Sequence, residues 1–266
     1  MRLFALCSAI VGASIRGQMQ YRLNFLVDVG FGLVYQSVGF LFIWIVVGKF
    51  ETLGGWGLTE IALLYGMRLV AHGLWVVNFS RLYSIDRTVR QGEFDRMLIR
   101  PMPVMLQLMY SQFRIATLGD LLGGTVLLTV ALARVDIDWT PAKVILLVAA
   151  VIGGAMLDGA FQLGPAALTF RTLESRPLRF LFDDMFSLFG GYPTSVFQAF
   201  PRVFLTYIIP VAWMAWVPAT VLLARTDELP FPAWVAWCSP LLGMILLALA
   251  MWYFLRESSH YQSSGS

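Results

Sequence analysis

Residues 29–48 read VGFGLVYQSVGFLFIWIVVG and carry no charged side chain, between Asp28 and Lys49. About 20 apolar residues are enough for an α-helix to cross the hydrocarbon core of a bilayer. This run therefore predicts a transmembrane helix, which we place at residues 23–48. The composition agrees, because 58% of the 266 residues are hydrophobic and only 13% are charged. An ordinary soluble domain has about twice that share of charge.

Other apolar runs have the length of a span. They predict helices at residues 58–79, at residues 112–133, at residues 142–170 and between Glu228 and Arg256. Apolar side chains in residues 1–22 recur at helical spacing, which indicates an amphipathic helix at the membrane surface; they are Phe4, Ile10, Val11 and Ile15. The domain plan is thus an interface helix, a membrane domain over residues 23–256 and a cytoplasmic tail over residues 257–266.

The stretch 177–225 can be interpreted in two ways. Residues 203–224 are uncharged but contain prolines, whereas residues 178–191 are apolar but contain Asp183 and Asp184. Either the first part crosses the membrane and the second is a re-entrant hairpin, or the first lies on the membrane and the second crosses. Broken backbone is tolerated at membrane depth where protein covers it. Both versions add one crossing, so the sequence predicts an all-α bundle of six transmembrane helices.

The orientation follows from the distribution of basic residues, because short cytoplasmic loops are enriched in arginine and lysine. Of the 19 basic residues, two (Arg68 and Arg202) stay unassigned and four lie on one side, namely Lys49, Arg134, Lys143 and Arg225. The remaining 13 lie on the other side: Arg2, Arg16, Arg22, Arg81, Arg87, Arg90, Arg96, Arg100, Arg114, Arg171, Arg176, Arg179 and Arg256. The richer side is predicted to be cytoplasmic, with both termini there.

The loop between the second and third predicted spans has a helical pattern of its own. Leu82, Ile85 and Val89 share one face of a short helix, with Arg87 and Arg90 elsewhere. An amphipathic helix of this kind can dock in the groove of a partner. A solvated, positively charged loop explains the same pattern equally well.

The same loop continues into a second helical turn. Gly92 is placed to end the first helix. Glu93 and Asp95 then fall near the start of the next turn, where negative charge is favourable. Pro101 and Pro103 break the chain before the third span.

Several kinds of chemistry are excluded or disfavoured by the sequence. The only lysines, Lys49 and Lys143, have no P-loop pattern around them, so no nucleotide site is expected in this chain. His72 and His260 are the only histidines, which argues against a histidine-based zinc site and against a Ser-His-Asp triad. We therefore expect no catalytic residues and no metal site in this chain. We also expect no nucleic-acid partner, because no basic stretch is interleaved with exposed aromatics.

Charges within the predicted spans are costly unless they are paired. Arg68 lies near the middle of its span, and Asp28, Asp120 and Asp158 lie in the cytoplasmic halves of theirs. An unpaired charge at that depth costs at least about 2.5 kcal/mol, so these side chains should face the bundle interior. They form either a polar translocation path or a structural network of ion pairs.

Two blocks of the sequence resemble the permeases of ABC-2-type ABC transporters. Residues 91–104, QGEFDRMLIRPMPV, resemble the first cytoplasmic loop of that family, where a Gly-Thr-Leu-Glu-like stretch runs into a proline before the third span. Gly191-Tyr-Pro and Ile209-Pro-Val-Ala-Trp, with Pro218-Ala, resemble the segment after the fifth helix. The order and spacing of these blocks match best the uncharacterised ABC-2 exporter permeases.

The resemblance implies a fold of the type V exporter kind, with an N-terminal amphipathic helix and a re-entrant outer segment at residues 193–224. It implies that residues 80–103 are a coupling loop for separate ATPase subunits. The contact residues implied by position are Arg87, Arg90, Gly92, Glu93, Phe94, Asp95 and Arg96. An outer gate would involve Tyr192, Pro193, Pro210 and Pro218. Asp183 and Asp184 depart from a clean fifth span, which leaves its limits open.

The resemblance also implies the partners and the location. Two ATPase subunits would bind ATP and Mg²⁺, this chain would hold no cofactor, and a second permease chain, identical or homologous, would complete the path through the lipid. The expected location is the inner membrane of a bacterium. A stand-alone secondary transporter or a membrane scaffold is the alternative, although the former often shows an inverted repeat, which we do not find.

Overall fold

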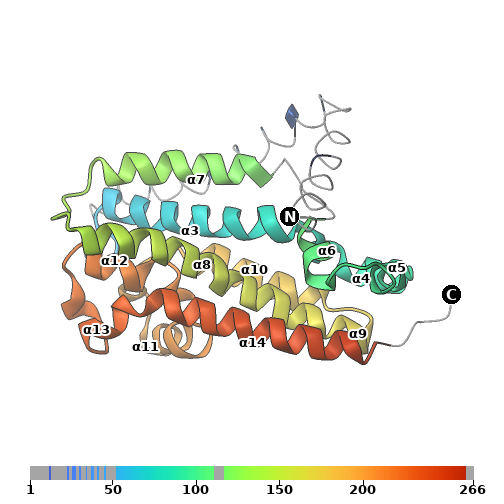
Figure 1. Ribbon diagram of the computed structural model, residues 1–266. Coiled ribbons are helices and arrows are strands. Elements are labelled where there is room, and N and C mark those ends of the chain that lie inside the picture. Colours follow the sequence, from blue (N-terminus) through green and yellow to red (C-terminus); the bar gives the residue numbers. More distant parts are fainter. Residues whose placement is uncertain are drawn as a thin grey trace.

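The computed structural model describes residues 52–110 and 117–261, together with single helical positions between Gly12 and Ile45. Within this part of the chain the secondary structure is helical, apart from an isolated bridge between Leu53 and Trp56. The long helices lie side by side in the order α7, α3, α8 and α14, and α4 to α6 gather at one end of the bundle (Figure 1). Their bounds are α3 Leu58–Phe79, α7 Thr117–Leu132, α8 Pro141–Ala167 and α14 Ser239–Ser259.

The predicted second and fourth spans are confirmed as helices. α3 has the predicted limits, and its first turn is closed by the Glu60 carboxylate, which accepts the backbone N–H of Gly57 at 2.8 Å. α8 begins at Pro141, behind a Thr140 side chain that accepts the N–H of Lys143. An N-cap hydroxyl and a proline in the first turn are both favourable at a helix start.

The number of spans stays a prediction. Within the described residues, three helices are long and apolar enough to cross a membrane, or four if a bent pair counts as one span. The predicted first span and interface helix lie largely outside the described residues, as does the start of the third span. The last span begins at Ser239, later than predicted, because Pro230 and Pro232 break the chain before it. It also runs to Ser259, into the predicted tail.

The ambiguous stretch between residues 177 and 225 is a broken helical segment. α10 (Arg176–Phe189) packs against α8, and its 14 residues are about 21 Å long, which is shorter than the hydrocarbon core. A chain of short helices follows: α11 (Ala199–Val203), a π turn (Phe204–Ile208), a 3₁₀ turn (Val211–Trp213) and α12 (Trp216–Leu222). The two halves of that chain are bent by 69° at a break that contains Pro210.

Small residues set the distances between the long helices. A Cβ on Gly159 of α8 would lie 2.3 Å from the Trp75 ring of α3, and a Cβ on Gly243 of α14 would lie 2.0 Å from the Gly153 carbonyl oxygen of α8. Gly159 therefore allows α3 and α8 to approach closely. Gly164 of the same helix has no atom within 4 Å of a Cβ placed there, so it sets no such distance.

The end of the bundle opposite α4 is fastened by Arg225. Its guanidinium lies 4.9 Å from the centre of the Trp56 ring and donates to the Gly55 carbonyl at 2.9 Å. It also lies 3.5 Å from the carboxylates of Glu60 and Glu228. These contacts join the turn before α3 to the 3₁₀ turn Thr226–Glu228 that leads towards α13 (Ala233–Trp237) and α14.

Candidate functional site

The loop after α3 is a folded unit and not an extended connection. It contains a 3₁₀ turn (Ser80–Ser84), α4 (Ile85–Arg90), α5 (Glu93–Leu98) and α6 (Val104–Tyr110). Leu82, Ile85 and Val89 are buried, whereas Arg87 and Arg90 are exposed. The predicted amphipathic helix is thus confirmed, since its apolar face packs on the protein and its arginines face outwards.

Gly92 makes the sharp turn between the two short helices. Its φ of +66° lies in the left-handed region, which glycine adopts without steric cost. Glu93 and Asp95 then lie in the first turn of α5, as predicted. Arg81 donates to the Glu93 carboxylate at 2.7 Å and thereby joins the start of the loop to α5.

Phe94 holds α5 against the rest of the protein. Its side chain is fully buried, with ring centroids 4.8 Å from that of Phe170 and 5.1 Å from that of Tyr261. Phe170 belongs to α9 (Thr169–Thr172), and Tyr261 follows α14. Phe94 therefore anchors the loop to two other elements and does not reach the surface.

Asp86 of α4 is the centre of a buried hydrogen-bond network. One carboxylate oxygen accepts from the Thr169 hydroxyl at 2.6 Å and from the Ser175 backbone N–H at 2.8 Å. The other oxygen is paired with the guanidinium of Arg179 on α10, which also donates to the Leu82 carbonyl. The loop is thereby attached to the first turn of α10.

The exposed side of α5 borders a shallow basic groove. Its volume is about 270 Å³, and it is lined by Arg81, Glu93, Arg96, Met97 and Arg100. Arg96 and Arg100 are exposed. The apolar side chains Leu98 and Ile99 stand beside them with 48% and 84% of their surface exposed. Exposed apolar groups next to exposed arginines form a surface suited to an acidic, partly apolar partner.

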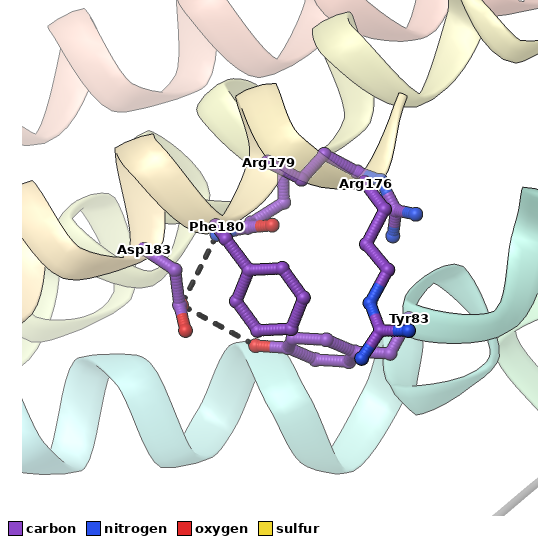
Figure 2. A pocket seen from close by; sticks show the side chains of 6 residues that line it. Tyr83, Arg176, Arg179, Phe180 and Asp183 are labelled. Carbon is purple, nitrogen blue, oxygen red and sulfur yellow. Dashed lines mark hydrogen bonds between the residues drawn. The ribbon is translucent and has the colours of Figure 1, made fainter. Parts of the chain in front are cut away.

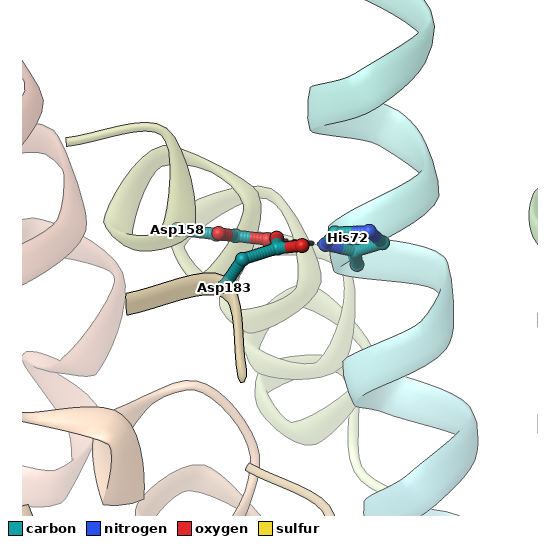
Figure 3. A group of neighbouring side chains, drawn as sticks. All are labelled: His72, Asp158 and Asp183. Atoms are coloured by element: carbon teal, nitrogen blue, oxygen red, sulfur yellow. Dashed lines mark hydrogen bonds and ion pairs between the residues drawn. The ribbon is translucent and has the colours of Figure 1, made fainter. Parts of the chain in front are cut away.

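A second polar site lies between the long helices. His72 of α3 lies with its Nδ1 2.7 Å from the carboxylate of Asp158 on α8, and Asp183 of α10 approaches the same point (Figure 3). One ligand atom from each of these residues lies within 4.8 Å of the others. Asp158, predicted to face the interior, is fully buried and pairs with His72 and not with Arg68.

Arg68 lies near this cluster but has its own contacts. Its guanidinium donates to the Ser187 hydroxyl at 3.0 Å and lies 5.3 Å from the centre of the Tyr65 ring. It is buried, as its position in the middle of α3 predicted. Asp120 lies in α7, and its side chain is outside the described part of the structure.

Asp183 also forms one wall of a small cavity. The cavity has a volume of about 10 Å³, room for roughly one water molecule. Figure 2 shows Asp183 facing the Tyr83 hydroxyl, with Arg176, Arg179 and Phe180 around the opening. The cavity thus reaches from the basic first turn of α10 to the carboxylate of the cluster.

A family model described as ABC-2 family transporter protein matches residues 33–265. The chain belongs to this family. No curated protein and no solved structure matches it. Membership confirms the resemblance to ABC-2-type permeases, and it makes the chain a multi-pass membrane protein and the permease component of an ABC transporter. The family is the membrane component of ABC transporters and is not itself catalytic, and in general it is partnered by ABC ATPase subunits.

The residues predicted for an outer gate lie in the broken segment of this ABC-2 permease. Tyr192 and Pro193 lie in the turn after α10, with Pro193 buried and Tyr192 half-buried. Pro210 is buried at the bend, and Pro218 is buried within α12. These residues are spread from the turn after α10 to α12 itself, and their role in gating stays a prediction.

Sequence reasoning missed Asp86 as the partner of Arg179 and missed the grouping of His72 with Asp158 and Asp183. Asp86 occurs in a loop rich in charge, where nothing marks one carboxylate as buried. The signal for Asp183 was present, since a carboxylate in an apolar stretch at membrane depth needs a partner.

Proposed function

We propose that this permease is the membrane subunit of an ATP-driven exporter in a bacterial inner membrane, and that residues 80–103 bind the ATPase subunit. The observation that carries this proposal is the folded loop itself. It buries one face on the protein and leaves Arg87, Arg90, Arg96 and Arg100 exposed, next to Leu98 and Ile99. A solvated connecting loop would need neither the buried Phe94 anchor nor the Asp86 network.

The anchors of the loop supply a route for coupling. ATP binding would close the partner ATPases and move the surface of α5. Because Phe94 packs on Phe170 and Tyr261, that movement would reach α9 and the end of α14. Because Asp86 is paired with Arg179, it would also reach α10 and the broken segment beyond it. These are the elements that would switch between inward-open and outward-open arrangements.

The full assembly would contain two permease chains, identical or homologous, and two ATPase subunits, with both ends of this chain in the cytoplasm. The arginine-rich side of the bundle carries the loop, which is consistent with the positive-inside rule. A stand-alone secondary transporter or scaffold is disfavoured by membership of an ABC transporter family.

The test is a pull-down of the chain from native membranes in a mild detergent, followed by an ATPase assay on the eluate. The informative variant is Arg96→Glu combined with Arg100→Glu, since both side chains are exposed and neither takes part in the buried network. Arg134→Glu, an exposed arginine after the far end of α7, is the matched control.

We expect an ATPase to co-elute with the native chain and with the control, and to be lost from the double variant. Loss from the control as well would mean that charge reversal disturbs the chain in general. An ATPase retained by the double variant would place the docking surface elsewhere, and absence of any ATPase would contradict the proposal.

A further inference from the structure

We infer that His72, Asp158 and Asp183 form a binding site for one divalent transition-metal ion between α3, α8 and α10. One ligand atom from each residue lies within 4.8 Å of the others (Figure 3). The three residues come from three separate helices, so an ion held there would join the helices of the bundle interior. The inference is independent of the proposed ATPase contact, because it concerns a different part of the chain.

One carboxylate oxygen of Asp158 has no hydrogen-bond partner among the described residues. Asp158 has no exposed surface, and its Oδ2 is used by His72 at 2.7 Å. Its Oδ1 is buried and has no hydrogen-bond partner among the described residues. A buried carboxylate oxygen without a partner is costly, particularly at membrane depth, where water cannot replace the missing bond. A cation bound by both oxygens of Asp158 would satisfy it.

The site also brings together the negative charges of Asp158 and Asp183. Two carboxylates within 4.8 Å of each other repel strongly where the surroundings are of low polarity. Arg68, a buried cation in the same helix as His72, donates to Ser187 and lies over the Tyr65 ring, and it makes no ion pair with either carboxylate in the described structure. A divalent ion would compensate both negative charges directly.

The carboxylate of Asp183 is oriented by hydrogen bonds from neighbouring helices. Its Oδ1 accepts from Gln162 Nε2 at 3.1 Å, and the Tyr83 hydroxyl lies 3.4 Å away on the same oxygen. Metal-binding carboxylates are commonly held by hydrogen bonds of this kind, which fix their direction. Both hydrogen bonds use this one oxygen, so the other oxygen can serve as a ligand at the point shared with His72.

The ligand set points to a class of metal. One imidazole nitrogen and two carboxylate oxygens suit Zn²⁺, Mn²⁺, Fe²⁺ or Co²⁺ better than Ca²⁺ or Mg²⁺, which prefer oxygen alone. Three protein ligands leave further positions for water. The cavity beside Asp183 in Figure 2 has room for about one water molecule and opens between Tyr83, Arg176 and Phe180.

Two histidines in the sequence argue against a histidine-based zinc site, but they do not exclude a site of one histidine and two carboxylates that other helices bring to His72. Asp158 is 86 residues away in the sequence. Only the rotation of α3, α8 and α10 about their axes places the three side chains together.

The test uses the full-length chain in lipid nanodiscs, stripped with a chelator and dialysed against Co²⁺, with Zn²⁺ in a second series. Bound metal is measured by inductively coupled plasma mass spectrometry, and the visible absorption spectrum of bound Co²⁺ reports its ligands. The variants are Asp183→Asn, Asp158→Asn and His72→Gln. The matched controls are Asp184→Asn, the neighbouring carboxylate, and His260→Gln, the only other histidine.

We expect about one ion per wild-type chain and per control chain, and a loss of affinity of roughly tenfold or more in each ligand variant. The Co²⁺ spectrum should change in His72→Gln and be unchanged in His260→Gln. Thermal unfolding of the metal-free proteins checks that the variants fold. If a ligand variant does not fold, Tyr83→Phe removes a single hydrogen bond to Asp183 and should still weaken binding.

Absence of binding by the wild-type chain would overturn the inference. So would equal binding by all ligand variants, or loss of binding in His260→Gln, which would identify an adventitious surface ion. None of these outcomes would affect the proposed function, because no ATPase partner is present in the assay.

Discussion

Asp86 of the loop after α3 forms a buried ion pair with Arg179 of α10, 93 residues further along the chain. Only 5% of the Asp86 side chain and 4% of the Arg179 side chain are exposed. Buried pairs of this kind add little net stability compared with a well-packed apolar pair, but removal of one partner leaves an uncompensated charge. The pair therefore fixes where the loop sits more than it increases the stability of the fold.

The first prediction concerns this pair. Asp86→Asn keeps the size of the side chain but leaves the charge of Arg179 without a counterion, and we expect it to lower the free energy of unfolding by about 3–5 kcal/mol. Glu93→Gln is the matched control, because it breaks an exposed ion pair. The Arg81 side chain of that pair is 22% exposed and the Glu93 side chain is 45% exposed. The control should cost about 1 kcal/mol or less. Thermal or denaturant unfolding in detergent measures both, and equal losses would contradict the importance of burial.

The second prediction concerns the contact of α3 with α8. Gly159→Ala would place a Cβ 2.3 Å from Trp75 Cε3, so the ring or the helix must shift. We expect a loss of about 1–3 kcal/mol from overpacking. Trp75→Ala removes the ring that clashes, so the double variant should lose less than the sum of the single variants. Ile152→Ala, an exposed position of the same helix, should have a much smaller effect.

The limits of α3 and the start of α8 could be predicted from the sequence, whereas the contacts between the helices could not. α3 matched its prediction because the run from Leu58 to Phe79 lies between a glycine-rich turn and the first charge of the loop. From the sequence alone, Arg179 was one of the 13 basic residues that assign the cytoplasmic side. In the structure its guanidinium is buried against Asp86, because packing of α10 excludes water from that point.

In the candidate sites, too, features local to one helix could be predicted and contacts between helices could not. Periodicity correctly separated the buried face of α4 from its exposed arginines, since that depends only on neighbours along one helix. The partner of Asp158 depended on how three helices are rotated, and no residue near it in the sequence indicates His72. Phe94 was grouped with the exposed contact residues because an aromatic in a charged loop gives no sign of which side it faces.

The third prediction concerns Arg225 at the opposite end of the bundle. Its guanidinium stacks on Trp56 and donates to the Gly55 carbonyl. Lysine keeps the charge but cannot stack a planar group on Trp56 while it donates to Gly55 and lies between the two carboxylates. We expect Arg225→Lys to lower the free energy of unfolding by about 1 kcal/mol and to increase proteolysis of the turn at residues 52–57. Arg202→Lys, an exposed arginine that donates only to backbone carbonyls, is the comparison. A variant as resistant to protease as the wild type would show that the Arg225 contacts are dispensable.

The fourth prediction separates the position of the loop from its contact with the ATPase. Phe94→Ala removes a fully buried ring that packs on Phe170 and Tyr261. We expect this change to lower the stability of the isolated permease by about 3–5 kcal/mol and to weaken ATPase capture as a consequence. Arg96→Glu should have the opposite profile, with unchanged stability and weakened capture, because the side chain is exposed.

Both variants are measured in the same two assays, namely thermal unfolding of the purified chain and recovery of ATPase activity in the pull-down. Phe94→Leu, which keeps an apolar side chain, should recover part of the stability and part of the capture together. If Phe94→Ala instead left stability intact and abolished capture, the ring would contact the ATPase directly, in a conformation in which α5 has swung away from α9. Phe94 would then be a docking residue, as its position in the sequence implied, and the loop would move on binding.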